Sequence, residues 1–149
     1  MSTPEETTRT QIKEALKAGD KERVSTLRLL LAAIKNERIR RGEEVDEAGM
    51  IRLVRKAIKQ RKDSAEQYRK GDREELAAKE EREAEILSEY LPPPIDEGEL
   101  RSAIAALVET ESLAGPAAIG AIMKAMMAKY AERAEGGTIN RIARDVLGI

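Results

Sequence analysis

The chain has 149 residues, which is enough for one domain or two small ones. Hydrophobic residues make up 41% of it, which is enough to fill a core and excludes global disorder. Charged residues make up 37% of the chain, yet they nearly cancel to a net charge of −1. The absence of Cys and His excludes disulfides, zinc fingers, thiolate catalysis and histidine bases, and the lack of Phe and Trp excludes an aromatic platform for stacked bases.

Two helices are predicted at the beginning of the chain. The first covers about residues 10–18 and ends at Gly19, which suits a left-handed helix terminus. Asp20 is expected to cap the second helix, which covers about residues 21–40. Its apolar residues recur at three- and four-residue steps, as expected for one buried stripe; they are Val24, Leu27, Leu30, Leu31 and Ile34.

Two longer helices are predicted next. Asp46 is expected to cap the third helix, which ends near Lys70. Asp72 and Glu75 have the spacing of a capping box, so the fourth helix is expected to start at Asp72. Its first turns are highly charged, and its apolar residues gather between 86 and 91. Much of this helix should therefore face water.

Three prolines, Pro92–Pro94, separate the fourth helix from a smaller second part, because proline lacks an amide donor and pushes the preceding residue out of helical conformation. Three short helices are predicted there. Asp96 should cap the first, Pro116 should open the second and Thr138 should cap the third. The sequence thus predicts an all-α chain: a charged N-terminal domain of about four helices over residues 1–91, and a three-helix domain over residues 95–149.

Charge is unevenly distributed along the first part. Twelve bases and five acids lie between residues 23 and 62, a local net charge of +7, whereas residues 63–89 have a net charge of −5. One interpretation is a basic helical hairpin that binds nucleic-acid phosphates. The other is that this hairpin simply lies against the acidic fourth helix. The candidate RNA-binding residues on shared helix faces are Arg28 and Lys35 on the second helix and Arg55, Lys59 and Lys62 on the third.

The second part offers weaker candidates. Lys124, Lys129, Arg141 and Arg144 could contact RNA, or could be ordinary solvated charges at helix ends. Three further residues, Gly120, Met123 and Met127, could form a partner-docking surface, since small residues admit a close backbone and thioethers adapt to many shapes. The alternative for this set is packing within the domain.

No catalytic site is recognisable. No serine stands beside a suitable base, and no glycine-rich phosphate-binding loop is present. We therefore predict no independent activity, no cofactor and no metal site. No apolar run is long enough to span a membrane, and the polar N-terminal segment lacks an apolar signal core, so a cytoplasmic location is expected.

Several motifs together resemble the YqeY-like proteins. They are Ser25–Asn36, the stretch Gln60–Ser64 followed by Tyr68 and Gly71, Glu85–Leu87 leading to Tyr90–Pro92, and Ile119–Gly120 with Met123–Lys124, Gly136 and the final helix. The match covers nearly the whole chain in the family's order.

The resemblance implies a relation to the tail of the GatB subunit of tRNA-dependent amidotransferases, a helical module that helps to hold tRNA. It also implies an association with carbon–nitrogen ligase chemistry that uses glutamine as amido donor. We therefore expect a non-catalytic module that binds tRNA or another structured RNA, as an accessory to tRNA-dependent amidation. The alternatives are a helical adaptor that binds a protein of the translation machinery, and an amidotransferase-related activity.

Overall fold

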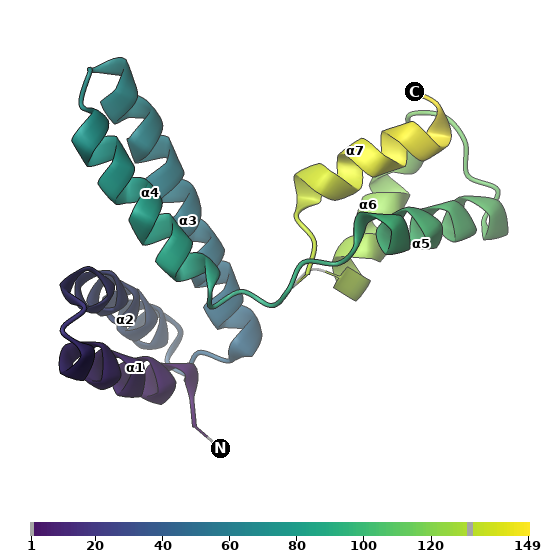
Figure 1. Cartoon of the computed structure of the whole chain (residues 1–149). Coiled ribbons are helices and arrows are strands. Elements are labelled where there is room, and N and C mark those ends of the chain that lie inside the picture. Colours follow the sequence, from purple (N-terminus) through teal and green to yellow (C-terminus); the bar gives the residue numbers. More distant parts are fainter. Residues whose placement is uncertain (1, 131–132) are drawn as a thin grey trace. The chain divides into compact units, whose positions relative to one another are not determined.

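The computed structural model describes residues 2–130 and 133–149, which form seven α-helices and no strand (Figure 1). The predicted all-α class is confirmed. The helices are α1 (Pro4–Ala18), α2 (Lys21–Arg41), α3 (Glu47–Lys70), α4 (Glu74–Ser88), α5 (Glu97–Thr110), α6 (Ala118–Tyr130) and α7 (Gly136–Leu147). The chain divides into two compact units, one up to Leu91 and one from Pro92 onward, and each has a hydrophobic core of its own.

The first unit consists of two helical pairs, α1 with α2 and α3 with α4 (Figure 1). Helix α2 also contacts both α3 and α4, so it connects the two pairs. The core is aliphatic, as the composition requires, and its most buried members come from three helices: Leu27, Leu30 and Ile34 of α2, Val54 of α3 and Leu87 of α4. This packing leaves the outer sides of α2 and α3 exposed to solvent.

The second unit packs α5, α6 and α7 around a separate aliphatic core. Leu100, Ile104, Ile122, Ile139 and Ile142 are all completely buried there. One backbone hydrogen bond joins the start of this unit to the segment before α7: the Ile95 amide donates to the Arg133 carbonyl over 2.8 Å.

Several predicted helix ends are confirmed. Gly19 has φ +72°, the left-handed conformation in which residues with a Cβ are strained, and its amide donates to carbonyls in the last turn of α1. The Asp20 carboxylate accepts a hydrogen bond from the Arg23 amide over 3.1 Å. Asp46 and Asp96 cap α3 and α5 in the same way. Gly19 and Asp20 together therefore form the tight turn between α1 and α2.

Other predicted ends are wrong. Helix α1 begins six residues earlier than predicted, at Pro4, because Thr3 and Glu6 form a complete capping box. Asp72 does not cap α4: with φ 59° it belongs to the turn that ends α3, where its amide donates to the Arg69 carbonyl. A residue in this conformation cannot take the extended geometry of an N-cap, so Arg73 precedes α4 without a side-chain cap.

The starts of the last two helices also differ from the prediction. Pro116 lies in a turn before α6, which begins at Ala118. The Ala118 and Ile119 amides close this turn on carbonyls three residues back. Helix α7 begins two residues before Thr138, so that Thr138 falls within the first turn and the N-cap is Glu135.

Candidate nucleic-acid interface

Several of the twelve cations between residues 23 and 62 form ion pairs with carboxylates of other described residues. The pairs are Arg23–Glu89 at 2.7 Å, Arg38–Glu5 at 3.3 Å, Arg40–Glu37 at 2.6 Å, Arg41–Glu37 at 2.8 Å and Arg61–Glu83 at 3.3 Å. The hydrogen bond from Arg23 lowers the pKa of the Glu89 carboxyl, and the hydrogen bond from Arg40 lowers that of Glu37. These cations are already engaged within the fold and are poor candidates for binding phosphate.

Four exposed cations lie along α3, and we call them the α3 basic face: Arg52, Lys56, Lys59 and Lys62. Lys56 also lines a pocket between α2 and α3, and Lys62 lines one between α3 and α4. Within the described ranges, none of the four forms an ion pair. They follow one another at steps of four, three and three residues, so they lie along one side of the helix over about 15 Å. Phosphate groups could therefore approach all four without first displacing a carboxylate.

The structure modifies the predicted set on α3. Lys59 and Lys62 are exposed as expected, whereas Arg55 is half-buried and already makes a contact within the protein. Arg55 lies four residues after Ile51 and three before Ile58, which places it beside the buried side of the helix. Arg52 and Lys56 were not among the predicted contacts, although the sequence contained the signal, because both continue the spacing of Lys59.

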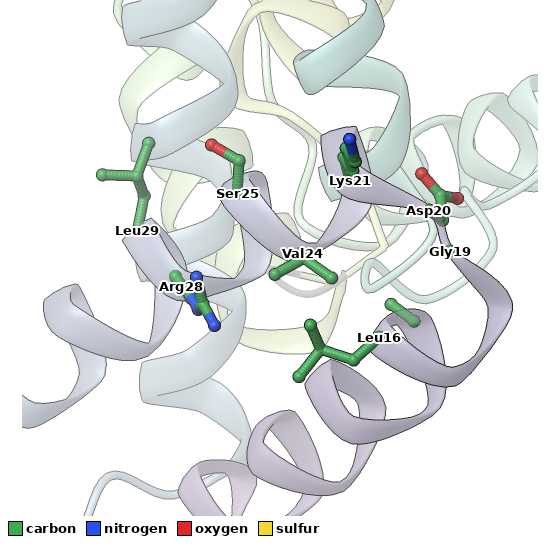
Figure 2. Close-up of a pocket in the computed structure, with 9 residues that line it drawn as sticks. Leu16, Gly19, Asp20, Lys21, Val24, Ser25, Arg28 and Leu29 are labelled. Atoms are coloured by element: carbon green, nitrogen blue, oxygen red, sulfur yellow. The ribbon is translucent and has the colours of Figure 1, made fainter.

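The two candidates on α2 lie in different surroundings. Arg28 is exposed and lines a pocket of about 570 Å³ between α1 and α2, with Leu16 and Leu29 also in its lining (Figure 2). Lys35 is half-buried one heptad further along α2, and neither residue forms an ion pair with another described residue. The five predicted cations of the first unit are therefore not gathered into one surface.

The alternative interpretation, that basic and acidic helices pair with each other, applies to a different set of cations. Arg61 of α3 pairs with Glu83 of α4, and Arg69 pairs with Glu74 at 3.0 Å and also with Glu81. The hydrogen bond from Arg69 lowers the pKa of Glu81. These contacts hold α3 and α4 together, and they leave the cations of the α3 basic face unused.

The candidate cations of the second unit are largely engaged or dispersed. Arg141 pairs with Glu97 at 2.6 Å, and the Arg144 Nε donates to the Asn140 Oδ1 over 2.9 Å. Lys129 Nζ lies 5.2 Å from the centroid of the Tyr130 ring. Lys124 is exposed, but it lies about 140° away from Lys129 around α6, since each residue advances about 100°.

The predicted docking residues of α6 differ in exposure. Gly120 is exposed, and a Cβ added there would meet nothing within 4 Å, so packing inside the unit does not explain this glycine. Met127 is 36% exposed. Met123 is half-buried against the core of the second unit, and its Cε lies 3.6 Å from the position of a Cβ at Gly136. Only Gly120 and Met127 are therefore well exposed.

Replacing Gly120 with Ala should stabilise the second unit by about 0.5–1 kcal/mol. Glycine in a helix costs about this much relative to alanine, and the open surroundings accept the extra methyl group. Urea unfolding followed by circular dichroism would measure the change. Ala128→Gly, at another exposed position of α6, should produce a loss of similar size. A destabilising Gly120→Ala change would mean that the small side chain is required within the fold.

The described residues contain no group of three or more acidic side chains placed to hold a metal ion. They also contain no helix that is long and apolar enough to cross a membrane.

Comparison with known proteins identifies relatives of the chain. It is 39% identical over 100 residues to the altered inheritance of mitochondria protein 41, mitochondrial, of Lachancea thermotolerans, a match that covers 65% of this chain and 54% of the relative. Proteins of the same name from Vanderwaltozyma polyspora and Saccharomyces cerevisiae are 40% and 36% identical over 81 residues, which is 54% of this chain and 44% of each relative.

This chain spans about half the length of those curated relatives. Their names place them in mitochondria, so they give no support to the cytoplasmic location expected for this chain. A family model covers far more of the sequence: the model described as Yqey-like protein matches residues 5–147. The chain belongs to the YqeY-like protein family.

Proposed function

We propose that this protein binds tRNA or another structured RNA through phosphate contacts made by the α3 basic face. The observation that carries the proposal is the row of four exposed cations that make no ion pair with other described residues. Phosphate contacts of this kind supply affinity and position the partner, but they read no sequence. The expected binding is therefore selective for the shape and charge of the RNA.

Salt dependence is the expected signature of such binding. Each cation that neutralises a phosphate releases condensed counterions, so the logarithm of the binding constant falls linearly with the logarithm of salt concentration. Four contacts predict a slope of roughly −3 to −4, by analogy with nucleic-acid duplexes. Substituting three of the four cations should reduce that slope to about −1 and abolish measurable binding at physiological salt.

A filter-binding titration of the full chain against tRNA, repeated at several salt concentrations, tests the proposal. The informative variant is Lys56→Glu/Lys59→Glu/Lys62→Glu. Its matched control, Arg9→Glu/Arg73→Glu/Lys79→Glu, changes the net charge equally at exposed positions of the same unit that lie outside the α3 basic face. Circular dichroism would establish that both variants remain folded.

The control variant should retain most of the affinity and the steep slope, apart from a modest loss due to net charge. Equal losses of affinity in the two variants would mean that binding depends on the net charge of the protein and not on the α3 basic face. Absence of binding to tRNA and to other folded RNAs at low salt would refute the proposed function.

A further inference from the structure

The pocket between α1 and α2, which we call the α1–α2 groove, has a lining that the proposed RNA contacts do not use. Its apolar wall is formed by Leu16 of α1 and by Val24 and Leu29 of α2. In Figure 2, Arg28 and Val24 lie on the side of α2 that faces α1, near Leu16, whereas Ser25 and Leu29 project from the other edge of α2. The groove therefore combines apolar side chains from two helices with exposed polar groups between them.

The two leucines of the groove are among the most exposed large apolar side chains of the described residues. Leu16 and Leu29 are each 53% exposed, whereas Leu27 and Leu30 beside Leu29 are buried in the core. Single exposed apolar residues are common, but two of them lining one concave surface are typical of an interaction site. The volume of about 570 Å³ can accept several apolar side chains from a partner.

The charge of the groove specifies the partner further. Lys21 and Arg28 are exposed at its edge and form no ion pair with the residues described. Asp20 contributes the single carboxylate of the lining, and it is already used: it accepts from the Arg23 amide at 3.1 Å and lies 3.4 Å from the Arg23 Nε. The groove thus presents apolar surface and net positive charge together.

We infer that the α1–α2 groove docks an amphipathic helix with acidic flanks from a partner protein. The apolar side chains of such a helix, at steps of three and four residues, would cover Leu16, Val24 and Leu29. Its carboxylates would meet Lys21 and Arg28, which would set the orientation and increase the association rate.

Other occupants match the lining less well. RNA would leave both leucines facing a charged backbone, and this chain has no Phe or Trp with which to stack bases. A second copy of the chain placed symmetrically on the groove would bring Lys21 and Arg28 against their own counterparts, which is repulsive. An acidic amphipathic helix is complementary to both the apolar and the cationic parts.

The probe is a fluorescein-labelled synthetic peptide of about 18 residues, with leucines at helical three- and four-residue steps and glutamates elsewhere, titrated against the full chain by fluorescence anisotropy. Two comparison peptides carry lysines in place of the glutamates or the same residues in scrambled order. Leu29→Ser and Arg28→Glu should each weaken binding of the acidic peptide by roughly tenfold or more. Ile39→Ser is the matched control: Ile39 is 71% exposed on the same helix but lines a different pocket.

Support requires saturable binding of the acidic peptide, weaker binding of both comparison peptides, and amide shift changes at Gly19 and Ser25 in a nuclear magnetic resonance titration. Absent binding, equal binding of the scrambled peptide, or equal effects of Leu29→Ser and Ile39→Ser would overturn the inference. So would self-association abolished by Leu29→Ser, which would assign the groove to a second copy, or tRNA binding that depends on Arg28 and Leu29. The RNA proposal is tested separately, because the variant that removes its contacts, Lys56→Glu/Lys59→Glu/Lys62→Glu, changes only α3.

Discussion

Replacing Arg61 with Met should destabilise the first unit by about 3–5 kcal/mol, although Arg61 lies within a stretch of cations that look exchangeable in the sequence. Arg61 and Glu83 join α3 to α4 through a contact of 3.3 Å, and their side chains are only 13% and 10% exposed. Arg61 Nη1 also donates to the Ala57 carbonyl over 3.2 Å. Loss of the guanidinium would leave the Glu83 carboxylate buried without its partner.

The double variant Arg61→Met/Glu83→Leu should recover most of this loss. Replacing both members of a buried pair with apolar groups removes the desolvation cost together with the attraction, and the outcome is often neutral. Arg82→Met is the control, since Arg82 and Glu22 also join two helices at 2.9 Å but are 52% and 38% exposed. Its expected cost is about 0–1 kcal/mol. Urea unfolding of the variants, followed by circular dichroism, measures these differences. If Arg61→Met cost as little stability as Arg82→Met, the buried ion pair would not have the role proposed for it.

The stability of the first unit should fall as the pH is lowered through the acid range. Hydrogen bonds from Arg40, Arg69 and Arg23 lower the pKa values of the Glu37, Glu81 and Glu89 carboxyls in the folded state. The stabilisation from these pairs is therefore present at neutral pH and is lost as the carboxylates become protonated. Urea unfolding at a series of pH values measures the trend, and a free energy of unfolding that stays constant into the acid range would contradict it.

The sequence predicts the helices well where a local hydrogen bond determines the end. Asp20, Asp46 and Asp96 each accept from an amide three residues ahead, so their effect is visible in a short window of sequence. Asp72 has the same local pattern, but the preceding turn of α3 takes it into a left-handed conformation. Whether Asp72 ends α3 or starts α4 depends on the backbone conformation of the residues before and after it. A capping pattern of four residues contains no information on that conformation.

The candidate interface could be predicted only in part, for a related reason. Counting cations finds the basic stretch, but it cannot distinguish Arg61, which pairs with a carboxylate 22 residues away, from Lys62 beside it, which does not. That distinction depends on which side of α3 meets α4. The exposure of Leu29, in contrast, follows from the helical register: Leu29 falls outside the predicted stripe of Val24, Leu27, Leu30, Leu31 and Ile34.

Replacing Ile104 with Ala should destabilise the second unit by about 2–5 kcal/mol. Ile104 of α5 is completely buried, and it belongs to a core made only from residues of this unit. A domain of roughly 60 residues has little stability to lose. We therefore expect the variant to leave the second unit largely unfolded.

The first unit should remain folded in this variant, because its core shares no residue with that of the second. Heteronuclear magnetic resonance spectra would show amides of α5–α7 collapsing to unfolded positions while those of α1–α4 keep theirs. Leu27→Ala, which opens a cavity in the first core, is the reciprocal variant and should affect α1–α4 first. Loss of native resonances from both units in either variant would contradict this expectation and would show that the two cores unfold cooperatively. The α1–α2 groove and the α3 basic face would then both depend on the folding of the whole chain.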